Sequence, residues 1–190
     1  MIKAVIFDFF GVLCSEEHWQ LLKSEVSTPG KFGELARSVH LGEMSWQKFV
    51  EKVAAETGQT PDKVQELYAS EKINLPLASY IEKLHQRYKT ALLSNASGGF
   101  LKPLLKRSGL ANLFDEIIIS SEVGIIKPDP RIYEYAVERL GVSVSQTVFV
   151  DDAPARVEGA AKVGIHTVLY RDFEQMKTDL EKILSPVSDN

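Results

Sequence analysis

The sequence predicts a doubly wound parallel α/β core with a bundle of helices inserted after the first strand. Short apolar runs that end in polar residues alternate with amphipathic stretches along most of the chain. An apolar run of this kind is typical of a strand buried on both faces of a parallel sheet, and an amphipathic stretch is typical of a helix that covers the sheet. One long interval near the N-terminus contains helical patterns without a convincing strand, which predicts the insert.

The strands of the core are predicted from five apolar runs. They lie at residues 4–7, 90–93, 116–119, 147–150 and 166–170. Helical patterns separate them, at residues 77–88, 100–109, 130–141 and 154–164, and prolines at the first turn or glycines at the end mark several of these helices. Because strand and helix alternate, the connections must be crossovers. The sheet is therefore predicted to be parallel, Rossmann-like and covered on both faces.

The insert is predicted at residues 15–75, and the core at residues 1–14 and 76–190. Helical stretches in the insert lie at residues 17–26, 31–41, 45–57 and 61–70. Ser45 and Thr60 precede two of them as hydroxyl caps, and Pro61 lies in a first turn. An all-helical segment of this length, placed directly after the first strand, is typical of a lid over the sheet.

The composition is that of a globular protein and argues against several classes of partner. Apolar residues make up 44% of the 190 residues, and the net charge is −4, without a basic stripe that would bind nucleic acid. No apolar run approaches the roughly 20 residues of a membrane helix, and Asp8 precedes any signal-peptide core. Cys14 is the only cysteine, so an internal disulfide is impossible. We therefore expect a cytoplasmic protein that binds neither nucleic acid nor a membrane.

Side chains that can carry chemistry gather where the predicted strands end. These positions are Asp8, Ser94 with Asn95, Lys127, and Asp151 with Asp152. Taken one at a time, each is also explained by a turn, a helix cap or a solvated loop. The carboxyl ends of parallel strands, however, form the edge of the sheet where ligands bind. Two adjacent carboxylates also repel one another unless a cation or a donor lies between them, so the pair at 151–152 favours a functional site.

Taken together and in this order, these positions resemble the motifs of the haloacid dehalogenase superfamily. The matching segments are FDFFGVL at residues 7–13, LLSN at 92–95, GIIKPDP at 124–130 and FVDD at 149–152. The resemblance extends over residues 1–170, and the place and size of the insert resemble subfamily IA, which has a helical cap after the first motif. It implies a hydrolase in which the first and fourth strands lie side by side.

The resemblance implies catalytic roles for Asp8, Ser94 and Lys127 and a substrate-binding role for Asn95. Asp8 would attack the phosphorus of a phosphate ester and form an aspartyl-phosphate, a covalent route that splits one hard step into two. Ser94 and the backbone beside Asn95 would bind a phosphate oxygen. Lys127 would hold the nucleophile in place and offset negative charge in the transition state. The implied substrate is a small phosphorylated metabolite, whereas no pattern in the sequence indicates an oligomeric state.

The resemblance also implies a bound Mg²⁺ as the cofactor. Mg²⁺ prefers oxygen ligands and takes one or two carboxylates. The implied ligands are Asp8, Asp152 and the backbone carbonyl of Phe10, with Asp151 as a more distant or water-mediated ligand.

Phe10 departs from the pattern of the phosphatases in this superfamily. Those enzymes carry an acid/base aspartate two residues after the nucleophile, and a phenyl ring can neither protonate a leaving group nor activate water. Positioned acid/base catalysis contributes roughly 10²- to 10⁴-fold in rate, so we predict a weakened phosphatase. Two alternatives remain open. One is a metal-independent 2-haloacid dehalogenase-type hydrolase, against which Asp151 and Asp152 argue, and the other is a catalytically feeble binding or regulatory protein.

The histidines of the chain and the large aromatic residues of the insert are expected to have structural roles. The histidines at positions 18, 40, 85 and 166 lie in unrelated segments and suggest no metal cluster or catalytic triad. Trp19, Trp46 and Phe49 are expected in the core of the insert rather than on a surface that binds substrate.

Overall fold

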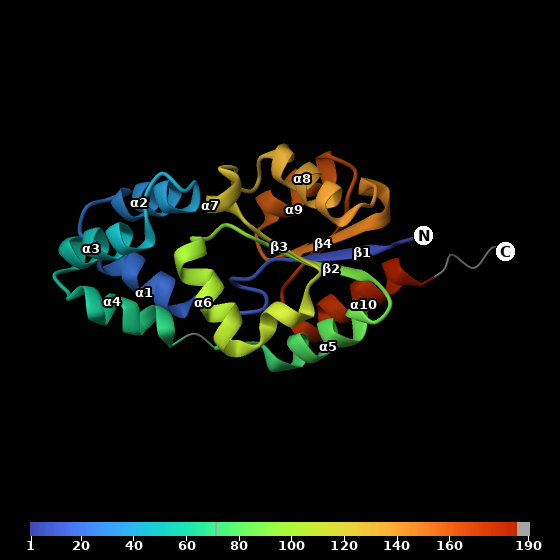
Figure 1. Ribbon diagram of the computed structural model, residues 1–190, viewed down its shortest axis with the longest axis horizontal. Coiled ribbons are helices and arrows are strands. Elements are labelled where there is room, and N and C mark those ends of the chain that lie inside the picture. Colours follow the sequence, from blue (N-terminus) through green and yellow to red (C-terminus); the bar gives the residue numbers. More distant parts are fainter. Residues whose placement is uncertain (71, 186–190) are drawn as a thin grey trace.

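The computed structural model describes residues 1–70 and 72–185 without the side chain of His18, so the expectation for that histidine lies outside the described part. In this part of the chain, five parallel strands form one sheet in the order β3-β2-β1-β4-β5 (Figure 1). The strands are β1 (Ala4–Phe7), β2 (Lys89–Ser94), β3 (Glu116–Ile119), β4 (Thr147–Asp151) and β5 (His166–Leu169). Helices cover both faces, which confirms the predicted doubly wound, Rossmann-like core.

The central strand β1 shows how the two faces are covered. Its fully buried side chains alternate: Val5 and Phe7 lie in one apolar cluster, and Ala4 and Ile6 lie in the other. The first cluster includes residues of α5 (Leu75–His85), α6 (Gly98–Ser108) and α10 (Phe173–Leu184), and the second includes residues of α8 (Pro130–Leu140) and α9 (Pro154–Lys162). Shorter helical segments are α7 (Ser120–Val123) and the 3-10 turns Leu110–Leu113 and Val144–Gln146. None of the described helices has the length and apolar character needed to cross a bilayer.

The register of the central strands brings their carboxyl ends together. Phe7 of β1 pairs with Leu92 of β2 on one side and with Val150 of β4 on the other. The backbone N–H of Asp8 continues this ladder and donates to the carbonyl of Val150 at 2.9 Å. The prediction that the first and fourth strands are neighbours is therefore confirmed, and Asp8 and Asp151 leave the sheet side by side.

The insert forms a cap beyond the edge of the sheet where the strands end (Figure 1). Its helices are α1 (Glu17–Glu25), α2 (Lys31–His40), α3 (Trp46–Thr57) and α4 (Pro61–Ala69). The predicted caps are confirmed, since the side chains of Ser45 and Thr60 accept hydrogen bonds from the backbone N–H of the third residue of α3 and of α4. The two segments that join cap and core run side by side, and the backbones of Cys14 and Ile73 pair in an isolated antiparallel β-bridge. Residues 15–75 remain our proposal for the extent of the cap.

Candidate active site

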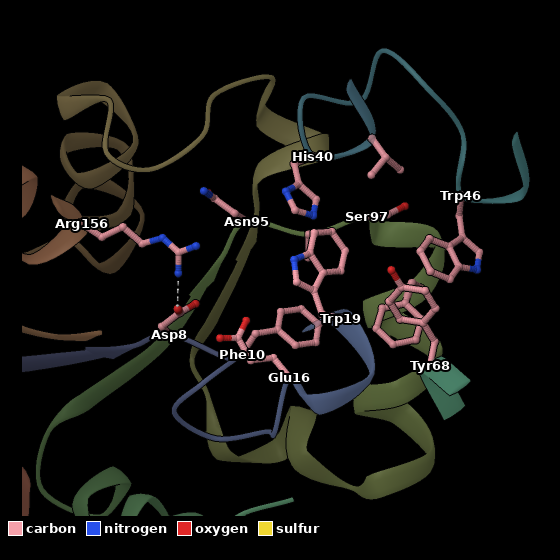
Figure 2. A pocket seen from close by; sticks show the side chains of 13 residues that line it. Asp8, Phe10, Glu16, Trp19, His40, Trp46, Tyr68, Asn95, Ser97 and Arg156 are labelled. Atoms are coloured by element: carbon pink, nitrogen blue, oxygen red, sulfur yellow. Dashed lines mark hydrogen bonds and ion pairs between the residues drawn. The ribbon is translucent and has the colours of Figure 1, made fainter. Parts of the chain in front are cut away.

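Asp8 follows β1 directly, and its carboxylate is buried at the carboxyl edge of the sheet. Oδ1 accepts a hydrogen bond from the backbone N–H of Phe9 at 2.7 Å and lies 2.8 Å from Nζ of Lys127. Oδ2 accepts from Nη1 of Arg156 at 3.0 Å (Figure 2). The pKa of Asp8 is raised to about 7 overall. Burial is the main cause and the charge of Asp151 adds to it, while the charges of Lys127 and Arg156 act in the opposite direction. The two cations therefore favour the ionised carboxylate, which is the form that can act as a nucleophile.

Lys127 lies fully buried between two carboxylates. Its Nζ is 2.8 Å from Oδ1 of Asp8 and 2.7 Å from Oδ2 of Asp151, and it donates to the backbone carbonyl of Leu93 at 2.8 Å. A lysine ammonium group has three donors, and these three acceptors occupy all of them. Lys127 therefore fixes the positions of Asp8 and Asp151 relative to the end of β2.

Asp151 and Asp152 complete a cluster of carboxylates with Asp8. One carboxylate oxygen from each residue lies within 4.8 Å of the other two. Burial alone would raise the pKa of Asp151, but the charges of Lys127 and Arg156 outweigh it and lower that pKa overall. The pKa of Asp152 is raised, first by burial and then by the charge of Asp151. Close packing of like charges of this kind is typical of a site that a cation neutralises.

The donor set of this cluster fits Mg²⁺. All its side-chain donors are hard carboxylate oxygens, and Oδ1 of Asp152 is buried without a hydrogen-bond partner among the described residues. Gly11 brings the loop after β1 against the same carboxylate, because a Cβ at position 11, where φ is +81°, would clash with Asp152. Phe10 precedes this glycine, so the main chain that carries the implied carbonyl ligand approaches the cluster.

Arg156 is a member of the site that the sequence analysis missed. It lies in the first turn of α9, and its Nη1 is 3.0 Å from Oδ2 of Asp8, 3.5 Å from Oδ1 of Asp151 and 3.8 Å from Oδ1 of Asp152. A signal was present in the sequence, because the predicted helix begins at Pro154, just after Asp151 and Asp152. Its first turn must therefore start near these carboxylates, and Arg156 is the charged residue in that turn.

Ser94 and Asn95, at the end of β2, differ in what their side chains contact. Ser94 is fully buried, and its hydroxyl has no hydrogen-bond partner in the described part of the chain. The side-chain amide of Asn95 donates to the backbone carbonyl of Lys127 at 3.0 Å and accepts from its N–H at 2.8 Å. Asn95 therefore holds the Lys127 loop in place, although it also lines the cavity described next.

A cavity with about 580 Å³ of empty space, part of it open to solvent, lies between the core and the cap (Figure 2). From the core, it is lined by Asp8, Phe10, Asn95, Ala96, Ser97, Phe100 and Arg156. From the cap, it is lined by Glu16, Trp19, Val39, His40, Trp46 and Tyr68. Asp8 therefore places a buried carboxylate at the wall of this cavity.

Aromatic rings form much of the remaining wall. The ring centroids of Trp46 in the cap and Phe100 in the core are 4.8 Å apart, and the ring of Phe10 stacks on that of Phe100 with centroids 6.2 Å apart. Phe49 is fully buried in the apolar core, as expected. The expectation for Trp19 and Trp46 was incomplete, because both pack on the core of the cap and also line the cavity.

His40 also lines the cavity, which corrects its expected assignment to the core or the surface. Its ring stacks on that of Trp19, with centroids 5.4 Å apart. Burial lowers the pKa of His40 from its usual 6.5 to about 4, and the positive charges of Arg156 and Lys127 act in the same direction. The imidazole is therefore neutral at physiological pH, so one ring nitrogen can donate a hydrogen bond and the other can accept one, but the ring adds no charge to the cavity.

The burial of neutral His40 predicts an acid-sensitive contribution to stability. Between pH 6.5 and about pH 4, the unfolded chain protonates this histidine while the folded chain does not, so the free energy of unfolding falls as the pH falls. We expect the loss between about pH 7 and about pH 5 to be smaller by about 2 kcal/mol in His40→Gln than in the native protein. Urea denaturation at both pH values measures this difference. His166→Gln, at an exposed position, is the control, and an equal loss in all three proteins would contradict the prediction.

The structure thus combines a parallel α/β core, a buried aspartate at the end of its central strand and a helical cap over that edge. The family model of the haloacid dehalogenase-like hydrolases matches residues 2–164. The chain belongs to this family, which confirms the resemblance found in its motifs.

Relatives in this family carry out different reactions. The chain is 39% identical over 92 residues to (S)-2-haloacid dehalogenase 4A of Burkholderia cepacia, covering 48% of this chain and 40% of that protein. It is 31% identical over 158 residues to the phosphoserine phosphatase of Thermus thermophilus, covering 78% of this chain and 62% of the phosphatase. These matches span less than two thirds of each relative. A family enzyme from Bacteroides thetaiotaomicron, solved in complex with magnesium and inorganic phosphate, has a TM-score of 0.75 at 20% identity, covering 90% of this chain and 95% of that one.

Proposed function

We propose that the chain is a Mg²⁺-dependent phosphoric monoester hydrolase that acts on a small phosphorylated metabolite through Asp8. The observation that carries this proposal is the carboxylate cluster, in which Asp8 lies against Asp151 and Asp152 at the wall of a cavity. Such a cluster suits a hard cation and, through it, an anionic substrate. The phosphatase relative and the fold neighbour that binds magnesium and inorganic phosphate support the same chemistry.

The residues of the site divide the reaction between them. A carboxylate oxygen of Asp8 forms a bond to phosphorus as the bond to the leaving-group oxygen breaks, and water then hydrolyses the aspartyl-phosphate. Lys127 holds Asp8 in place, and the unpartnered hydroxyl of Ser94 donates to a phosphate oxygen. Mg²⁺ held by Asp8, Asp152 and the carbonyl of Phe10 would supply charge neutralisation between the nucleophile and the phosphate.

Phe10 makes this proposed phosphatase slow. Its ring packs edge-on against Phe9, with centroids 4.9 Å apart, and it presents no group that can give or take a proton. The leaving oxygen must therefore depart without a positioned acid, and water must attack the aspartyl-phosphate without a positioned base. We propose that the covalent intermediate on Asp8 is long-lived for this reason.

The cavity favours a compact leaving group with an apolar or planar face. Trp46, Phe100 and Phe10 supply ring surfaces, and Glu16 is the carboxylate that the cap adds to the lining. Among phosphate esters, we therefore expect an aryl phosphate to give a higher kcat/KM than sugar phosphates, whose hydroxyl groups would lose water against these rings.

Phe10→Asp is expected to raise the rate of Mg²⁺-dependent phosphate release by at least about 10²-fold, because it restores a positioned acid and base beside Asp8. The gain should be larger for sugar phosphates than for an activated aryl phosphate, whose leaving group departs without protonation. Phosphate release from both substrate types, measured with excess Mg²⁺ and with a chelator, checks the prediction.

Phe10→Asn is the matched control, because it has the shape of aspartate without its acid/base chemistry. If both variants release phosphate faster by the same factor, the gain comes from the smaller side chain and not from acid/base catalysis. If neither native protein nor Phe10→Asp releases phosphate, the proposal is wrong, and halide release becomes the next assay. A dehalogenase-type reaction is the second candidate, since Phe10 and a cationic Arg156 beside Asp8 would suffice for a leaving group that needs neither proton nor metal.

A further inference from the structure

Arg156 places a permanent positive charge on the carboxylates that the proposed metal needs. Its Nη1 lies 3.0 Å from Oδ2 of Asp8, 3.5 Å from Oδ1 of Asp151 and 3.8 Å from Oδ1 of Asp152. These are the three residues whose oxygens lie within 4.8 Å of one another. One guanidinium nitrogen therefore occupies the position from which a cation would contact all three.

Arg156 and a divalent ion are mutually exclusive neighbours of this cluster for two reasons. A guanidinium group keeps its charge at any physiological pH, so it repels a metal ion at contact distance, and the repulsion is strong in a site with little water. In addition, the lone pair of Asp8 Oδ2 that accepts the hydrogen bond from Arg156 is not free to bind a metal ion at the same time.

The structure gives Arg156 a way to leave the cluster. Its side chain is 31% exposed, whereas those of Lys127, Asp8 and Asp151 are at most 1% exposed. It lines the cavity, and Figure 2 shows one edge of its guanidinium directed at Asp8 and the rest extending toward the open space. Glu16, which also lines the cavity, attracts the same charge. Lys127, by contrast, has no comparable freedom to move.

We propose that Arg156 is a tethered counter-cation that competes with the divalent metal for Asp8, Asp151 and Asp152. In the metal-free protein, it neutralises the cluster and keeps the carboxylates together. Metal binding then requires Arg156 to withdraw into the cavity, so the native residue weakens the affinity for metal. This inference rests on the proposed metal site and concerns a residue that lies outside the four matching motif segments.

The test is direct metal binding to the 190-residue chain, freed of metal with a chelator. Titration calorimetry with Mg²⁺ alone, and with Mn²⁺ alone, gives the Kd for native protein, Arg156→Gln and Arg156→Lys. We expect Arg156→Gln to bind at least about tenfold more tightly than the native protein, because removing one charge at contact distance removes a strong repulsion. Arg156→Lys keeps the positive charge on a flexible side chain, so its Kd for metal should lie between the Kd values of the native protein and of Arg156→Gln.

Lys162→Gln is the matched control. It removes one positive charge from the same helix, but Lys162 is exposed and pairs with Glu158 away from the cluster. Its Kd for metal should remain within about twofold of native, since solvent and salt screen an exposed charge. A second readout is the Tm without metal, which should fall in Arg156→Gln and recover on addition of Mg²⁺, because the metal replaces the missing counter-charge.

The outcomes separate this inference from the proposed function. Equal or weaker metal binding by Arg156→Gln, in proteins that do bind metal, overturns the competition and leaves the metal site standing. Absence of metal binding in every variant overturns both the competition and the Mg²⁺ dependence of the proposed hydrolase. Tighter binding confined to Arg156→Gln and, to a lesser degree, Arg156→Lys supports the competition, whether or not phosphate esters are turned over.

Discussion

Replacing Asp8 with asparagine is expected to reduce phosphate release by at least about 10⁴-fold, because an amide oxygen is a poor nucleophile and the covalent route is closed. Asparagine keeps the shape of the side chain and can still accept from the backbone N–H of Phe9. Initial rates with an activated aryl phosphate measure the loss. Intact-mass spectrometry after acid quenching should show a phosphoryl adduct on the native protein that Asp8→Asn does not form.

Asp62→Asn, at an exposed position on α4, is the control for loss of one carboxylate. Phosphate release that persists in Asp8→Asn would assign the attack to water or to another residue. The substitution does not by itself exclude carbon–halogen hydrolysis, since that reaction would use the same nucleophile. Chelation separates the two reactions, because only the phosphatase is expected to lose its activity when Mg²⁺ is removed.

The sheet edge and its polar residues could be predicted from the sequence because they depend on local patterns. Buried parallel strands appear as continuous apolar runs, so their last residues locate the carboxyl edge. Asp8, Lys127 and Asp151 meet there, and the pairing of Phe7 with Val150 explains why two segments far apart in the sequence supply neighbouring carboxylates. The motifs indicated the family, and the family indicated which strands are neighbours.

The cavity could not be predicted in the same way because it is a tertiary property. Trp19, His40 and Trp46 come from different helices of the cap, and each alone has an ordinary structural explanation. The direction of a side chain is equally hidden in the sequence. Asn95 is a residue type that often binds ligands. Its side-chain amide, however, donates to the backbone carbonyl of Lys127 and accepts from the backbone N–H of the same residue.

The charges of the site explain why Lys127 and Arg156 differ in what they can do. Both lie against Asp8 and Asp151, yet Lys127 is completely enclosed and Arg156 reaches the cavity. An enclosed cation stabilises buried carboxylates in every state of the site, whereas one at the cavity wall can be exchanged for another cation. We therefore expect the stability of the fold to depend on Lys127 and, under our proposal, the affinity for metal to depend on Arg156.

Lys127→Met is accordingly expected to lower the free energy of unfolding by about 3–5 kcal/mol, because it removes the enclosed cation from between two buried carboxylates. Methionine has a similar length, so the change removes the charge and three hydrogen bonds with little change in volume. Urea denaturation of the metal-free protein at neutral pH measures the loss. Phosphate release should fall as well, since Asp8 loses the contact that holds it.

Lys102→Met provides the comparison that assigns this effect to burial. Lys102 also forms an ion pair, at 2.6 Å from Glu122, but the two side chains are 61% and 42% exposed. Exposed pairs of this kind contribute about 0–1 kcal/mol, so its loss should scarcely change the urea midpoint. If Lys127→Met were no more destabilising than Lys102→Met, the buried carboxylates would have to be neutralised by protonation or by Arg156 alone. In that case, Lys127 would act in positioning Asp8 and not in supporting the fold.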